Sequence, residues 1–185
     1  MGKILCFIYD TMADFETNLA CHMLGDAEKH SIAIGYEKVP YEGLSYMQYI
    51  PKMTVKEALE LDDVEGLIIP GGWERECREE LIELINKLHS EKKLIAAICA
   101  APEFLAKAGI LHNHKYTTTI SEESRNKMKD SFPIENFIEK RVVVDENVIT
   151  AIGSAYREFG ISILDYFESF ENDDERKSYI EKYKG

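Results

Sequence analysis

The sequence predicts an α/β fold built on a mainly parallel sheet. Two observations indicate it: short, almost continuously apolar segments recur along the 185 residues, and amphipathic segments of about a dozen residues separate them. This alternation is typical of βαβ units. Hydrophobic residues make up 45% of the chain and charged residues 30%, as in ordinary globular proteins. We expect a single domain over residues 1–185, with its core in about 3–170.

The first half of the chain is expected to supply three buried strands, at residues 3–9, 31–36 and 64–69. Helices are expected at 15–27 and 77–90, where apolar residues recur with helical spacing. Between the second and third strands, residues 41–54 contain a glycine, a proline and several tyrosines, which favours an irregular hairpin. A short helical turn at 55–61 follows it.

The second half continues the pattern. An apolar run at 93–98 predicts a buried strand, and β-branched residues predict another at 115–119. The two segments 141–145 and 148–151 flank Asp145-Glu146-Asn147 and are expected to form a hairpin. Helices are expected in the remaining regular segments: 100–109, 121–130, 159–170 and a charged C-terminal helix at 173–184.

Charge and composition narrow the classes of partner. The net charge of −12 argues against nucleic acid and anionic membranes as partners, because both require a basic surface. The apolar runs have the length of strands, so no membrane span is expected, and no signal peptide precedes the first strand. The four cysteines have no metal-binding spacing. We therefore expect reduced thiols, a cytoplasmic location, and neither a metal nor a cofactor.

In parallel α/β sheets, ligands bind at the carboxyl ends of the strands. The segments expected there are 10–16, 70–75, Cys99, 119–122 and 153–156. Functional residues should be sought in these loops.

Cys99 is the most informative residue among them. It stands between the apolar strand and the helix that follows, with small neighbours at Ala97, Ala100 and Ala101. A cysteine on such a sharp turn has the layout of a nucleophile elbow. The N-terminus of the next helix is expected to favour its thiolate. The alternative is an inert buried cysteine, since free cysteines are often buried.

Two other loops carry groups suited to a thiol site. Glu16 opens the helix after the first strand, where its carboxyl group could face the cysteine and hydrogen-bond to sulfur. It could equally be a helix-start glutamate that interacts with the helix dipole. Gly71 and Gly72 follow the third strand, and backbone without Cβ atoms allows N–H groups to approach a ligand or an oxyanion. The alternative is a plain turn.

Together, these motifs resemble the DJ-1/PfpI (ThiJ/PfpI) family, a branch of the class I glutamine amidotransferase-like superfamily. The resemblance rests on Glu16, the segments 68–72 and 96–102, and the glycine-rich turn at 153–159, in that order along the chain. It implies a flavodoxin-like three-layer sandwich with a cysteine nucleophile elbow, and a homodimer. It also implies a reactive Cys99, with Glu16 as its carboxyl partner and the backbone of Gly71, Gly72 and Ala100 near an oxyanion.

The sequence departs from this family at the histidines. Ala100 stands where family members proposed as proteases carry histidine, and Thr119 matches the histidine position of DJ-1-like members. None of the five histidines follows His114. His112 and His114 enter the expected strand 115–119 from its N-terminal end, so they should lie at the opposite edge of the sheet. This weakens every hydrolase reading that needs a Cys–His pair.

Five further residues are candidates for the pocket or for a contact between subunits, since they stand in or beside the loops expected at the carboxyl ends of the strands: Trp73, Glu74, Glu76, Thr119 and Tyr156. For the two glutamates, a solvated surface position is the alternative.

Four functions remain open. The first is an enzyme of glyoxalase or amidase type, in which Cys99 attacks a small carbonyl or amide and Glu16 acts as acid and base. The second is a redox or stress-response protein in which an oxidant converts Cys99 to a sulfinate. Further alternatives are a glutamine amidotransferase-like or intracellular protease-like hydrolase, and a non-catalytic small-molecule binding module. The expected partners are thus a small-molecule substrate or oxidant and a second copy of the chain.

Overall fold

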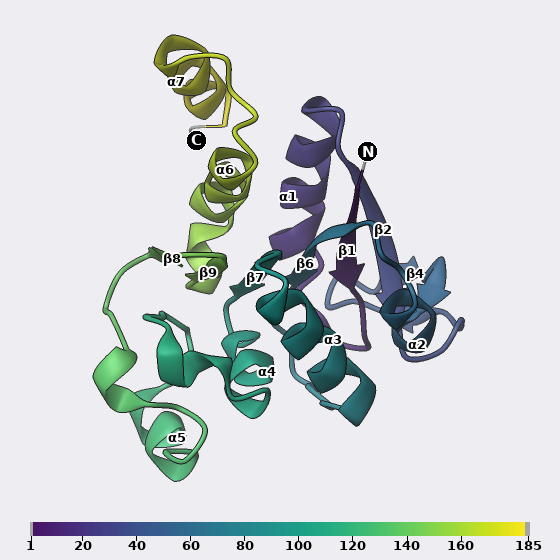
Figure 1. The fold of residues 1–185 in the computed structure, drawn as a ribbon, viewed down its shortest axis with the longest axis vertical. Helices are drawn as coiled ribbons and strands as arrows, with labels where there is room; N and C mark the ends of the chain where they lie inside the picture. Colours follow the sequence, from purple (N-terminus) through teal and green to yellow (C-terminus); the bar gives the residue numbers. More distant parts are fainter. Residues whose placement is uncertain (1, 184–185) are drawn as a thin grey trace.

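A seven-stranded sheet forms the centre of the computed structural model, which describes residues 2–183 (Figure 1). Its strand order is β5-β2-β1-β6-β7-β9-β8, and every neighbouring pair is parallel except the hairpin of β8 and β9. The strands are β1 (Lys3–Phe7), β2 (His30–Gly35), β5 (Met53–Thr54), β6 (Val64–Ile69), β7 (Leu94–Ile98), β8 (Val142–Asp145) and β9 (Val148–Ala151). The series β2-β1-β6-β7-β9 has the order of flavodoxin-like folds, so the predicted fold class is confirmed.

Helices cover both faces of this sheet (Figure 1). The helices α1 (Phe15–Asp26) and α6 (Tyr156–Tyr166) pack on one face, against residues such as Ile68 of β6. The helices α2 (Val55–Leu59), α3 (Glu79–Ser90) and α4 (Pro102–Lys107) cover the other face, where Leu67 and Ile69 point. Successive strand residues thus enter opposite cores, which explains why the central strands are apolar at most positions; Glu65 near the start of β6 is an exception.

The remaining elements lie around this sandwich. The short strands β3 (Tyr41–Glu42) and β4 (Gln48–Tyr49) form the expected hairpin excursion. Single 3-10 turns occur at Ile110–Asn113, Ile134–Asn136 and Gly153–Ala155. The short helix α5 (Glu122–Lys127) begins after Ser121, whose side chain accepts a hydrogen bond from the Ser124 N–H. The terminal helix α7 (Asp173–Lys182) is tied to α1 by a 2.9 Å hydrogen bond from Tyr179 to Asp26.

The predicted strand at 115–119 is wrong. This segment forms only an isolated bridge, between Tyr116 and Phe137. The N–H of Thr117 donates to the side chain of Thr150, and that of Thr119 donates to the carbonyl of Cys99. The backbone groups that a sheet ladder would need are therefore used elsewhere, although the β-branched composition suits a strand. In the described part of the chain, no helix is long and apolar enough to cross a membrane.

Candidate functional site

Cys99 follows β7 directly and stands at the carboxyl edge of the sheet. Its φ of 63° lies in the left-handed region, which is costly for a residue with a side chain. Three hydrogen bonds hold this conformation. The Cys99 N–H donates to the carbonyl of Ala151 (2.8 Å), and its own carbonyl accepts from the Thr119 N–H (2.9 Å) and the Thr118 hydroxyl (2.7 Å). The surrounding backbone therefore fixes the direction in which the side chain leaves the turn.

Glu16, on the first turn of α1, faces the sulfur. The residue is only 2% exposed, and its Oε2 accepts a 2.8 Å hydrogen bond from the Gly71 N–H. Its other oxygen, Oε1, lies toward the Cys99 sulfur, since both atoms come within 3.0 Å of the point where a Cβ on Gly153 would stand. The structure thus brings together the cysteine and the carboxyl group that stand 83 positions apart in the sequence (99 − 16).

The pKa values of the Glu16 carboxyl and the Cys99 thiol are both raised. Burial raises the pKa of the Glu16 carboxyl, although the hydrogen bonds from Gly71 and Cys99 partly oppose the shift. Burial also raises the pKa of Cys99 to about 11, and the negative charge of Glu16 adds to the effect. Two adjacent acids that cannot easily both be ionised share a proton, which suits transfer between sulfur and carboxyl.

The expectation that the following helix favours the thiolate is therefore not met. The N–H of Ala101 is bonded to Ile98, that of Glu103 is bonded to Ala100, and Pro102 has none. Only the Ala100 N–H reaches the sulfur and lowers its pKa, together with the Thr119 hydroxyl. These two donors do not offset burial, because a helix whose first N–H groups are already satisfied offers the sulfur little.

The two glycines after β6 have different roles. A Cβ on Gly71 would lie 2.6 Å from the Cys99 Cβ, so the close approach requires glycine, but the Gly71 N–H is occupied by Glu16. Gly72 forms an antiparallel bridge with Met12. In this bridge the Ala13 N–H donates to the carbonyl of Gly71, and the Trp73 N–H donates to the carbonyl of Thr11. The bridge leaves the Gly72 N–H unused. Gly72 and Ala100 are thus the backbone donors suited to an oxyanion, as the resemblance implies, and Gly71 is a support for Glu16.

Thr119 stands beside the sulfur. Its Oγ accepts a 2.9 Å hydrogen bond from the Gly153 N–H, which leaves the hydroxyl hydrogen free to point at Cys99, and the hydroxyl lowers the pKa of that thiol. A threonine hydroxyl can donate to a thiolate but cannot act as a general base near neutral pH. It therefore cannot replace the histidine of DJ-1-like proteins.

A pocket of about 600 Å³ opens over Cys99. Apolar groups contributed by Leu44, Trp73, Ile120 and Met128 form much of its wall, and Ser121 and Ser124 add hydroxyl groups. Gly72, Ala100 and Thr119 also line it, so the sulfur and the N–H groups of Gly72 and Ala100 face the same space. Its size suits a small organic molecule.

Of the five further candidates, Trp73 and Thr119 line this pocket; the Trp73 side chain is 75% exposed. Glu74 and Glu76 instead line a smaller cavity beside Tyr36, where Glu76 pairs with Arg78 at 3.0 Å. Tyr156 packs edge to face against Phe15, with ring centres 5.3 Å apart.

An ion pair at the pocket wall was missed by sequence reasoning. Arg75 binds Glu103 through both Nε and a terminal nitrogen, each at 2.9 Å, and also reaches the carbonyl of Gly72. Lys107 also contacts Glu103, at 2.7 Å. The pair ties the glycine loop to α4 and so fixes the spacing of the Gly72 and Ala100 N–H groups. The sequence feature that could have indicated this ion pair is Glu103 itself, an acidic residue in a helix that is otherwise apolar at its start.

His89 and His114 lie away from the sulfur, as the sequence predicts for His114. His114 is 4% exposed; its Nε2 is 2.7 Å from Nε2 of His89, and its Nδ1 is 3.5 Å from Asp145 at the turn before β9. This turn marks the amino edge of the sheet, opposite Cys99. Among residues 2–183, no cluster of three or more histidine, cysteine or acidic side chains could hold a metal ion.

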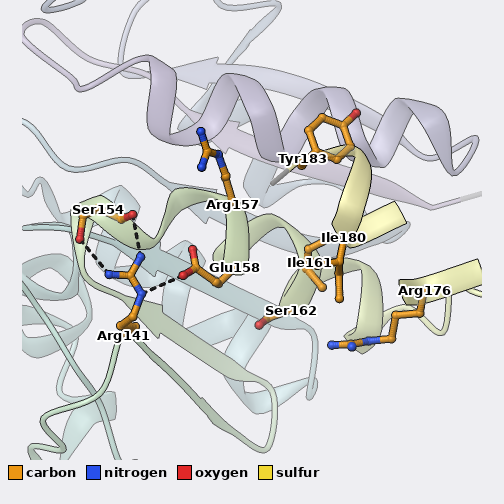
Figure 2. A pocket seen from close by; sticks show the side chains of 9 residues that line it. All are labelled: Arg141, Ser154, Arg157, Glu158, Ile161, Ser162, Arg176, Ile180 and Tyr183. Atoms are coloured by element: carbon orange, nitrogen blue, oxygen red, sulfur yellow. Dashed lines mark hydrogen bonds and ion pairs between the residues drawn. The ribbon is translucent and has the colours of Figure 1, made fainter. Parts of the chain in front are cut away.

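A second pocket, of about 400 Å³, lies among β8, α6 and α7 (Figure 2). Its charged groups largely satisfy one another: Arg141 donates to Glu158 at 2.8 Å and to the carbonyl of Ser154 at 2.9 Å. Arg176 makes two 2.7 Å hydrogen bonds to Asp165. No cysteine lines it, so the Cys99 pocket is the candidate functional site.

Comparison with known proteins identifies the group to which this geometry belongs. The sequence profile of the DJ-1/PfpI family matches residues 2–166. The chain belongs to the DJ-1/PfpI family. It is 30% identical to the uncharacterized protease YdeA of Bacillus subtilis, over 99% of this chain and 92% of that protein. It is also 30% identical to deglycase PfpI of Pyrococcus furiosus, over 80% of this chain and 89% of that protein.

Solved structures agree on the fold. The ThiJ/PfpI family protein from Bacillus anthracis superposes with a TM-score of 0.87 at 23% identity, covering 98% of this chain and 90% of that one. A DJ-1 superfamily protein from Agrobacterium tumefaciens gives a TM-score of 0.86, also at 23% identity, covering 99% and 97%. These likenesses place the chain within the fold of the family without naming a substrate.

Proposed function

We propose that this DJ-1/PfpI protein acts on small reactive carbonyl compounds, with Cys99 as the nucleophile and Glu16 as the acid and base. The observation that carries the proposal is the pairing of a sulfur at the floor of the 600 Å³ pocket with a buried carboxyl group. The deglycase name of the Pyrococcus furiosus relative supports a carbonyl-directed activity.

In the first step, the Cys99 sulfur attacks the aldehyde carbon, so that an S–C bond forms as the carbonyl π bond breaks. The thiol proton moves to the free oxygen of Glu16, whose raised pKa makes it a stronger base than an ordinary carboxylate. The N–H groups of Gly72 and Ala100 stabilise the developing alkoxide, which then takes the proton and leaves a hemithioacetal.

For an α-oxoaldehyde, the overall reaction adds one water and yields a 2-hydroxy acid, so no external oxidant is required. Glu16 can carry the proton between the adjacent carbons, because it stands next to the sulfur that holds the intermediate. The apolar wall of the pocket excludes water from the hemithioacetal until the final hydrolysis.

The test is turnover of a panel of α-oxoaldehydes, with aldehyde loss and 2-hydroxy acid formation measured together. We expect the wild type to convert at least one member and Cys99→Ser to be inactive. Cys77→Ser is the matched control: Cys77 is a partly buried free thiol whose pKa is also raised to about 11, but it does not line this pocket. Equal turnover by wild type and Cys99→Ser would refute the proposal.

A redox role of the same sulfur is the second candidate. The Ala100 N–H, the Thr119 hydroxyl and a protonated Glu16 could all donate to the oxygens of a Cys99 sulfinate. One similar structure, of the Toxoplasma gondii protein DJ-1, is described as oxidised. Peroxide should then add two oxygens to Cys99 while leaving Cys77 reduced, as mass spectrometry would show. Equal oxidation of both thiols would argue against this role.

A further inference from the structure

Two large apolar side chains of the Cys99 pocket remain exposed to solvent. Leu44 is 43% exposed and Trp73 is 75% exposed, and both line the pocket. Ile120 and Met128 extend the same apolar wall. Covering exposed apolar surface with an apolar group is favourable in proportion to the area removed from water. This wall is therefore suited to a ligand with an apolar substituent.

The charged groups of the pocket are already paired with each other. Arg75 and Glu103 both line the pocket, and two nitrogens of Arg75 lie 2.9 Å from Oε2 of Glu103. Lys107 occupies the other oxygen of Glu103 at 2.7 Å. A charged substituent that entered the pocket would lose its hydration and would meet no unpaired opposite charge on the wall formed by the described residues. The pocket therefore disfavours ligands that carry a carboxylate or a phosphate.

The pocket is also larger than the reacting part of an α-oxoaldehyde requires. Its volume is about 600 Å³. Two carbonyl groups displace roughly two or three water molecules, each of which takes about 30 Å³. Most of the pocket is therefore left for the substituent next to the carbonyl groups.

A buried carboxylate holds Leu44 in this wall. Asp14, which caps α1, is 4% exposed, and its Oδ2 accepts hydrogen bonds from the Ser45 hydroxyl and, at 2.8 Å, from the Tyr49 hydroxyl. The Leu44 N–H donates to the carbonyl of Met12 at 2.9 Å. The turn between β3 and β4 is thus attached to the segment before α1. A surface fixed in this way loses little conformational entropy when a ligand binds.

We propose that the Cys99 pocket selects neutral carbonyl compounds with a bulky apolar substituent, such as a phenyl group. Leu44 is the specificity-determining residue, and Asp14 is a positioning residue that holds its turn. This inference rests on the proposed function for the reaction itself, since the substituent takes no part in bond making or breaking.

Turnover tests the role of Leu44. The substrates are phenylglyoxal, methylglyoxal and 4-carboxyphenylglyoxal. One methylene in an apolar pocket changes kcat/KM by roughly 10–200-fold, so we expect wild-type kcat/KM for phenylglyoxal to exceed the other two by at least about 10-fold. Leu44→Ala should reduce the phenylglyoxal preference by about 10-fold. Ile50→Ala is the matched control, because Ile50 lies just after β4, is 68% exposed and does not line this pocket. Equal preferences in Leu44→Ala and wild type would overturn the role of Leu44.

Tyr49→Phe tests the hold of Asp14 on the turn. The substitution removes the hydroxyl that Asp14 binds and keeps the ring. We expect a higher KM for phenylglyoxal, with kcat and the constants for methylglyoxal unchanged, a split that a general loss of stability would not produce. Tyr46→Phe is the matched control, since Tyr46 is 83% exposed in the same turn. Equal changes for both substrates would overturn the positioning role.

Binding separates this inference from the proposed reaction. Cys99→Ala, which forms no hemithioacetal, is titrated with acetophenone, acetone and benzoylformate while the emission of Trp73, the single tryptophan, is followed. Only a saturable change reports binding, because collisional quenching does not saturate. We expect acetophenone to bind at least about 10-fold more tightly than the other two. Comparable binding of acetone or benzoylformate would overturn the inference. Turnover without preference would overturn it and leave the proposed function, whereas selective binding without turnover by the wild type would do the reverse.

Discussion

Glu16 and Cys99 converge on one point of the backbone, the α-carbon of Gly153. A Cβ placed there would lie 2.9 Å from Oε1 of Glu16 and 3.0 Å from Sγ of Cys99. Glycine at this position therefore leaves the space in which the carboxyl and the thiol meet. The Gly153 N–H also holds Thr119, so one residue positions three groups of the site.

Gly153→Ala is expected to separate this pair. The backbone N–H that binds Thr119 is retained, so the effect is that of the methyl group alone. Overpacking of this kind costs about 1–3 kcal/mol of stability. A displacement of about 1 Å at the reacting groups can lower turnover by roughly 10²-fold. Aldehyde turnover and urea unfolding measure the two effects.

The control for this substitution is Gly25→Ala, in α1, where an added Cβ has no neighbour within 4 Å. Alanine should stabilise that helix by about 0.5–1 kcal/mol and leave turnover unchanged. If Gly153→Ala, like Gly25→Ala, left turnover unchanged, a methyl group at position 153 would not disturb the function of the Glu16–Cys99 pair.

Glu16→Gln is expected to lower the pKa of the Cys99 thiol and, at the same time, to slow turnover. Because the carboxylate charge raises the Cys99 pKa, its removal should lower that pKa from about 11, and alkylation at neutral pH should become faster. Turnover should nevertheless fall by about 10²–10⁴-fold, since the amide cannot accept the thiol proton. The measurements are the pH profile of Cys99 alkylation and kcat. An unchanged alkylation profile would show that the charge of Glu16 does not act on the sulfur.

The His89–His114 pair should make stability sensitive to acid. Burial lowers the pKa of His89, the positive charges of His114 and Lys92 lower it further, and Glu146 opposes them. Asp145 faces His114 from the other side. The folded-state pKa thus lies below that of the unfolded chain, so the unfolded state binds more protons, and stability is lost as pH falls from roughly 7 to 5.

His89→Gln keeps a nitrogen near the position of Nε2 but cannot titrate. It should lose less unfolding free energy over this pH interval than the wild type, as urea midpoints at the two pH values would show. Equal losses would mean that other groups cause the acid sensitivity. Aldehyde turnover should not respond, because the pair lies at the opposite edge of the sheet from Cys99.

The apolar runs were sufficient to predict the sheet. Residues 64–69 form β6 with the bounds expected from the sequence, because a parallel strand buried on both faces is apolar at most of its positions. Residues 115–119 have a similar β-branched composition but make no ladder, since their N–H groups bind a side chain and the Cys99 carbonyl. A β-branched composition indicates that a segment prefers extended backbone. It does not indicate which groups the backbone of that segment will hydrogen-bond to.

The site was predictable in its residues and less so in its electrostatics. Their positions after strands allowed Glu16 and Cys99 to meet, but only the family resemblance led us to expect them as a pair. The raised pKa of Cys99 was not predictable, because it depends on burial and on which N–H groups of residues 100–103 are already bonded. The Arg75–Glu103 pair joins segments 28 residues apart, and no local pattern records such a contact.

The final prediction is that the isolated protein has negligible peptidase and glutaminase activity, although one relative is named an uncharacterized protease. Amide cleavage requires a group that takes the nucleophile's proton and returns it to the leaving amine. Thr119 and Ala100 stand at the family's histidine positions, and His114 is held at the far edge of the sheet by His89 and Asp145. Among residues 2–183, Glu16 is the acid placed at the sulfur, and its Oε2 accepts a hydrogen bond from the Gly71 N–H. Its remaining oxygen can serve an aldehyde, which expels no amine.

Without acid help to the leaving amine, amide cleavage should be slower by about 10²–10⁴-fold. Casein and glutamine hydrolysis should therefore match a Cys99→Ala control. Robust hydrolysis abolished by that substitution would show that Glu16 also protonates the leaving amine, or that a second subunit contributes the missing group.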